Sequence, residues 1–127
     1  MNNNIIHTFL SSFFKIFSAI INEYRIENKK IFGNIRWNDE NETQNFSWNI
    51  QFEESALKKL TQLCEYLRNH DLVIGDRITI TESKLQMRLF DLGWDKDEAQ
   101  RNIDRLCSVE VKMIDEGKET DSFFIHF

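Results

Sequence analysis

Three histidines and two cysteines are the side chains of this 127-residue chain that could act as bases, nucleophiles or metal ligands. Cys64 and His70 are close in sequence, and a thiolate nucleophile needs a base nearby. Cys64, however, falls on the apolar side of the helix that its neighbours predict, so its thiol is expected to point into the core. We therefore interpret Cys64 and Cys107 as unpaired thiols in a reducing compartment.

The histidines fall in positions that are typical of surface side chains. His7 lies on the polar side of the first predicted helix, His70 precedes Asp71 at a helix end, and His126 faces away from its apolar neighbours on a terminal strand. The chain contains no HExxH, CxxC or GxSxG pattern and no glycine-rich phosphate-binding loop. We therefore predict that the protein is not an enzyme, and we expect no metal and no cofactor.

The composition indicates one folded domain with a negative surface. The chain is 41% hydrophobic, with eleven Phe and three Trp, which suffices for a core without disulfides or a structural metal. The formal net charge is −5. This sign argues against binding to nucleic acid or anionic membranes through charge alone, and it favours a basic partner.

The first secondary-structure element that the sequence predicts is an apolar N-terminal helix. From Ile5 to Tyr24 the apolar residues fill one half of a helical wheel, which predicts an amphipathic helix packed on the core. The apolar run ending at Ile21 is short for a membrane span, is interrupted by polar residues, and lacks the positive charge that begins a secretion signal. We therefore expect a cytoplasmic protein without a membrane segment.

The central part of the chain predicts a hairpin followed by a helix. Apolar and polar residues alternate over residues 31–37 and again over 46–52, with an acidic turn between them. A helical pattern follows over residues 53–68, and residues 72–80 are ambiguous, with room for a short strand.

The C-terminal part predicts two short helices and a second hairpin. Thr81 is suited to cap one helix that Gly93 ends, and Asp95 to cap the next. Alternation over residues 109–113 and 123–127, around an acidic turn, predicts the hairpin. The sequence thus predicts an α+β fold in a single domain, residues 1–127. An N-terminal amphipathic helix lies on an antiparallel hairpin sheet in a first half, 1–72, and a winged-helix-like half, 73–127, follows.

Residues 78–127 resemble a winged helix-turn-helix in the order of their elements. A short strand precedes a helix over 81–89, a turn over 92–94, a second helix over 95–106 and the hairpin that would be the wing. The resemblance implies that the second helix enters the major groove and reads bases with Lys96, Gln100, Arg101 and Arg105. The charge speaks against this function, because from residue 76 onward eight Lys and Arg face twelve Asp and Glu.

The acidic residues of the two predicted hairpin turns are the candidate binding residues for a protein partner. Their negative side chains could steer a basic partner and fix its register. They are Asp39, Glu40, Glu42, Asp115, Glu116 and Glu119.

The function that these features favour is binding of a protein. We interpret the chain as a small bacterial immunity or inhibitor protein that blocks a basic partner such as a nuclease toxin. The alternatives are a winged helix-turn-helix transcription regulator and a phage-type DNA mimic or anti-defence protein. Self-association through the N-terminal helix or the C-terminal strand also stays open.

Overall fold

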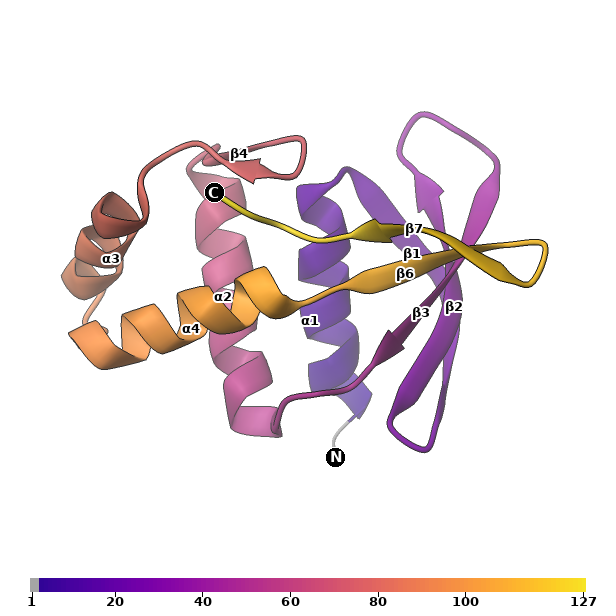
Figure 1. The fold of residues 1–127 in the computed structure, drawn as a ribbon, viewed down its shortest axis with the longest axis horizontal. Coiled ribbons are helices and arrows are strands. Elements are labelled where there is room, and N and C mark those ends of the chain that lie inside the picture. Colours follow the sequence, from indigo (N-terminus) through magenta and orange to yellow (C-terminus); the bar gives the residue numbers. More distant parts are fainter. Residues whose placement is uncertain (1–2) are drawn as a thin grey trace.

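The structure, a computed structural model, describes residues 3–127. These residues form an α+β fold with four helices, a five-stranded antiparallel sheet and a two-stranded ribbon (Figure 1). The elements in chain order are α1 (Asn3–Ile16), β1 (Ala19–Glu27), β2 (Lys30–Trp37), β3 (Thr43–Asn49), α2 (Glu54–Asn69), β4 (Val73–Ile74), β5 (Arg77–Ile78), α3 (Glu82–Asp91), α4 (Lys96–Ser108), β6 (Val111–Asp115) and β7 (Lys118–Phe123).

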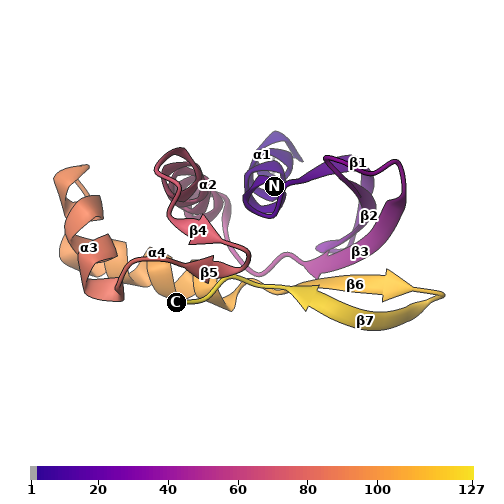
Figure 2. The ribbon, with the colours of Figure 1, turned by 90° about the horizontal axis from the view of Figure 1, so that it is seen from above.

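The main sheet joins strands from both halves of the chain. Its order is β1-β2-β3-β6-β7, and each neighbouring pair is antiparallel. The link between the halves is the pairing of β3 with β6, in which Phe46 lies opposite Met113. Figure 2 shows the first three strands curving around α1, which lies on the inner side of the curve.

Helix α1 fills the curved sheet with aromatic side chains. Phe9, Phe13 and Phe14 are fully buried. The ring of Phe14 lies 4.9 Å from that of Phe46 on β3 and 5.9 Å from that of Phe123 on β7. Offset and edge-on aromatic pairs at these separations stabilise a core beyond the area that they bury. The prediction of an N-terminal amphipathic helix packed on an antiparallel sheet is therefore confirmed.

The predicted length of this helix is wrong. Helix α1 ends at Ile16, and residues 19–27 form the edge strand β1. Ser18 takes a left-handed backbone conformation (φ 61°), which turns the chain without a glycine, and its carbonyl accepts a hydrogen bond from the Asn38 N–H. The strand is hard to recognise because a bulge between Ile21 and Glu23 interrupts the alternation of its apolar residues.

Strand β2 and the helices α2, α3 and α4 follow the sequence prediction closely, whereas β3 begins and ends three residues before the predicted strand 46–52, so Ile50 and Phe52 lie outside it. Both predicted caps are present, since the Lys84 N–H donates to Thr81 Oγ1 (3.2 Å) and the Glu98 N–H donates to Asp95 Oδ1 (2.7 Å). The ambiguous stretch forms the small β4–β5 ribbon.

The final hairpin is displaced from its predicted position. Its strands are β6 and β7, joined by a tight turn in which Glu116 (φ 51°) and Gly117 (φ 78°) are both left-handed. Residues 124–127, expected as the return strand, leave the sheet instead. The backbone of His126 accepts a hydrogen bond from the Ile78 N–H and donates one to the Asp76 carbonyl. Helices α3 and α4 and the hairpin occur in the order of a winged helix, with the hairpin forming one end of the main sheet.

Candidate functional site

Two hairpin turns that are distant in sequence meet at one side of the sheet. Asn45 pairs with Ile114, which brings the β2–β3 turn next to the β6–β7 turn. Between them lies a depression of about 290 Å³, which we call the acidic depression. It is lined by Trp37, Glu40, Glu42, Thr43, Gln44, Asn45, Ile114, Asp115 and Glu116.

Four of the six acidic residues singled out in the sequence line this depression. Glu40 and Glu42 come from one turn, and Asp115 and Glu116 come from the other. All four are exposed, and within residues 3–127 none lies within 4.0 Å of a basic group. Folding therefore gathers negative charge here without neutralising it.

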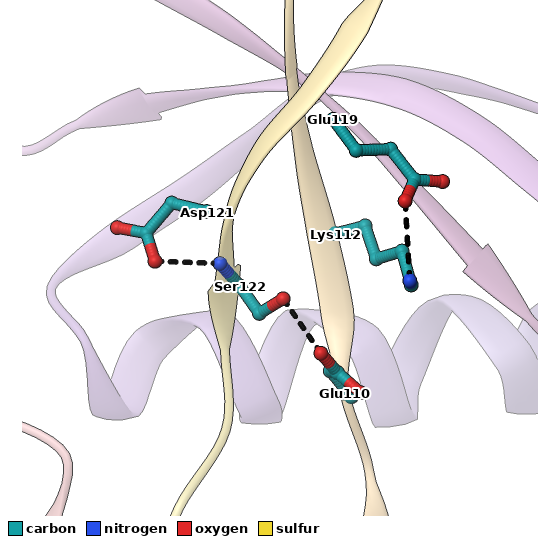
Figure 3. A network of polar contacts seen from close by, with 5 residues as sticks. All are labelled: Glu110, Lys112, Glu119, Asp121 and Ser122. Carbon is teal, nitrogen blue, oxygen red and sulfur yellow. Dashed lines mark hydrogen bonds and ion pairs between the residues drawn. The ribbon is translucent and has the colours of Figure 1, made fainter.

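The other two acidic residues lie outside the lining. Asp39 is exposed on the β2–β3 turn. Glu119 is engaged by its own hairpin, because Lys112 Nζ lies 3.1 Å from Glu119 Oε2 (Figure 3). This hydrogen bond and the negative charge of Glu119 raise the pKa of Lys112 above its ordinary value.

Further polar contacts hold the hairpin that carries half of the depression. Ser122 Oγ donates to Glu110 Oε1 (2.7 Å), and the Ser122 N–H donates to Asp121 Oδ1 (2.7 Å). Figure 3 shows these contacts and the Lys112–Glu119 pair on β6 and β7. The exposed contacts contribute little stability individually, but together they restrict the side chains of the hairpin.

A half-buried aromatic ring borders the acidic depression. Trp37 lies at the end of β2, and its ring is 5.3 Å from that of Phe123 on β7. Ile114 is also half-buried in the lining. The depression is therefore lined mainly by polar and charged groups, with a minor apolar share from Trp37 and Ile114.

Of the four residues that the winged-helix resemblance assigns to base reading, Gln100 is engaged by neighbouring side chains. Gln100 Nε2 donates to Glu82 Oε1 (3.0 Å) and to Asp104 Oδ1 (2.7 Å), and its Oε1 accepts from Gln86. Both ends of the Gln100 amide are therefore occupied. The other three are Lys96 and Arg101, which are exposed, and Arg105, which is half-buried.

The cysteines lie where an inert thiol is expected. Cys64 is fully buried on α2, and burial raises the pKa of its thiol strongly. Burial, with the nearby Glu82 and Asp104, raises the pKa of Cys107 to about 11. The ring of His70 is stacked on Tyr66 at 4.1 Å.

No group of three His, Cys, Asp or Glu side chains converges on a metal-sized site anywhere between residues 3 and 127. In the same part of the chain, no helix has the length and apolar character needed to cross a membrane.

Two further surface features were missed from the sequence. Met87 and Phe90, on the outer side of α3, are 69% and 65% exposed and border a shallow depression of about 250 Å³. The signal was present, because both residues fall on the side of the helix opposite to Leu85 and Leu89. The second feature is a depression of about 500 Å³ on the main sheet beside Phe32, which depends on strand curvature and has no sequence signal.

Comparison with known proteins adds no family to this description: no family model, no curated protein and no solved structure is significantly similar to the chain.

Proposed function

We propose that this chain is a small inhibitor of the immunity type, which binds and blocks a basic protein in the bacterial cytoplasm. The observation that carries the proposal is the convergence of Glu40, Glu42, Asp115 and Glu116 on one depression, with no basic neighbour among the described residues. A bacterial nuclease toxin, whose active surface must be basic to hold nucleic acid, is the partner class that fits this charge.

Uncompensated carboxylates suit this function because they act before and during contact. At a distance, a concentrated negative field accelerates the encounter with a positive surface. In contact, Lys or Arg of the partner can form charge-assisted hydrogen bonds with these carboxylates, which form no ion pair in the described part of the chain. Trp37 and Ile114 add a small apolar area to this mainly polar surface.

The hydrogen-bonding of the surrounding strands holds this surface in place. The β2–β3 turn is closed by paired strands, and the β6–β7 turn is a two-residue turn of the type that fits a hairpin. Binding to a site that is already ordered loses less conformational entropy, which favours tight, stoichiometric association.

We propose the same use, contact with protein, for the winged-helix-like order of α3, α4 and the β6–β7 hairpin. The engagement of Gln100 by Glu82 and Asp104 supports this choice over base reading. Asp95 and Asp97 at the start of α4 would also repel phosphates.

Affinity capture from a lysate of the source bacterium tests the proposal. The immobilised chain is expected to retain one basic protein at a stoichiometric level and to lose it when Glu40→Lys and Glu116→Lys are combined. Glu65→Lys, on the exposed side of α2, is the matched control and is expected to retain the partner. Recovery of DNA without a stable protein partner, with binding abolished by Arg101→Glu, would instead indicate a transcription regulator.

A further inference from the structure

Helix α3 has an apolar outer side that residues 3–127 leave exposed. Leu85 and Leu89 are fully buried and fix the orientation of the helix on the domain. This orientation directs Met87 and Phe90 outward, where they are 69% and 65% exposed. Two large, adjacent and mostly exposed apolar side chains on one short helix are characteristic of an interaction surface.

The charges beside these residues make the surface complementary to itself. Lys84 and Asp91 are seven residues apart, so they point in directions that differ by only about 20° around the helix axis. Along the axis, Met87 lies between them. Both are exposed, and between residues 3 and 127 neither forms an ion pair. An antiparallel copy of α3, related by a two-fold axis near Met87, would place each Lys84 next to Asp91 of the second copy.

We propose that α3 is a homodimerisation surface, with a second copy of this chain docked antiparallel across Met87. Met87 and Phe90 of each copy cover those of the other, and the shallow depression that they border with Gln86, Asp91 and Lys96 becomes part of the contact. Reversed polarity along the helix selects the antiparallel arrangement, since a parallel pair would oppose Lys84 to Lys84.

The small size of the surface limits the strength of the association. Helix α3 has ten residues, a length of about 15 Å. This contact is smaller than the roughly 800 Å² per partner that stable complexes bury. The dimer is therefore expected to be reversible, with a dissociation constant in the micromolar range.

The dimer leaves the acidic depression free. Figure 1 shows α3 at one end of the molecule and the β6–β7 turn at the other. A dimer through α3 would carry two acidic depressions at its far ends.

Sedimentation velocity of the full chain, from about 1 µM to about 500 µM, tests the proposal because this range spans the expected affinity. The wild-type chain is expected to shift from monomer to dimer. Met87→Glu is expected to remain monomeric. Ile74→Glu, at an equally exposed apolar residue of the β4–β5 ribbon, is the matched control and is expected to dimerise as the wild type does. Circular dichroism checks that each variant is folded.

Charge exchange identifies the antiparallel geometry. Lys84→Asp and Asp91→Lys are each expected to weaken the dimer about tenfold, because each creates two like-charged contacts. The double variant Lys84→Asp/Asp91→Lys is expected to restore wild-type affinity. A chain that stays monomeric at the highest concentration, a dimer that survives Met87→Glu, or a double variant no better than the single ones would overturn the proposal.

Discussion

Glu116→Gln is expected to make the isolated protein more stable, because the acidic depression gathers charges that repel one another. Folding brings Glu116 close to Glu40 and Glu42 across the depression. Carboxylates facing each other across such a depression are on the order of 8 Å apart, and two unit charges at about that distance in water repel by about 0.5 kcal/mol. Two such pairs amount to about 1 kcal/mol, which the neutral amide of Gln removes.

The dependence of this gain on salt separates repulsion from other effects of the substitution. The Debye length falls from about 30 Å at about 10 mM salt to about 3 Å at about 1 M, so the gain should decrease to about 0.1 kcal/mol. Urea unfolding, followed by the fluorescence of the buried Trp48 and Trp94, measures the free energy of unfolding. Glu65→Gln on α2 is the control and should give no comparable gain. A Glu116→Gln variant that is no more stable than the wild type, or whose gain is unchanged at about 1 M salt, would refute the reasoning.

Three further predictions concern the core, the sheet and the thiols. Phe14→Ala is expected to lower the free energy of unfolding by about 3–5 kcal/mol in urea titrations, because it empties a fully buried site between α1 and the sheet. Gly33→Ala is expected to cost about 1–3 kcal/mol in the same assay, because the new Cβ would lie 2.8 Å from Tyr24 Cβ and still closer to the Glu23 carbonyl. Cys107, with a pKa near 11, should react with a thiol reagent about tenfold faster for each pH unit between about 8 and 10. In the unfolded chain the pKa of this thiol has its ordinary value of 9.0, so the unfolded chain loses this proton at a lower pH than the folded chain does. The free energy of unfolding therefore falls as the pH rises from 9.0 to about 11.

Each of these predictions has a matched comparison. Phe14→Leu should cost less than about 1.5 kcal/mol, and equal losses for Leu and Ala would show that the site is not tightly packed. Gly75→Ala meets no neighbouring atom but places a Cβ at a positive φ of 65°, which alone costs about 1–2 kcal/mol. A Gly33→Ala variant with no loss of stability would argue against the close approach of β1 and β2. Thiol labelling that modifies the buried Cys64 in the folded protein as fast as Cys107 would contradict the described core.

The sequence predicts best those elements whose signals are local. Helices α3 and α4 begin where Thr81 and Asp95 cap them, and β2 follows the alternation over residues 31–37. The end of α1 could not be recognised because Ser18 turns the chain in a conformation that is uncommon for a residue other than glycine. The spacing of Ile16, Ile20 and Tyr24 then continues a helical period through what is in fact a bulged strand.

The candidate site was predictable in composition and not in arrangement. The acidic turns were recognisable as charge clusters, but their meeting depends on the pairing of Asn45 with Ile114, which no local pattern encodes. The engagement of Glu119 by Lys112 likewise depends on the register of β6 and β7. The exposed side of α3 was accessible to helical-wheel reasoning, since Met87 and Phe90 lie opposite to the buried Leu85 and Leu89.

The association rate of the captured partner, measured against salt concentration, tests most directly whether this chain acts through a negative surface. For the wild-type chain the rate is expected to fall steeply with rising salt, as in other electrostatically steered complexes. Glu40→Lys combined with Glu116→Lys should lower the rate at least tenfold at low salt and flatten its salt dependence, whereas Glu65→Lys should change neither. A rate that is independent of salt, or one that the double variant leaves unchanged, would contradict the account.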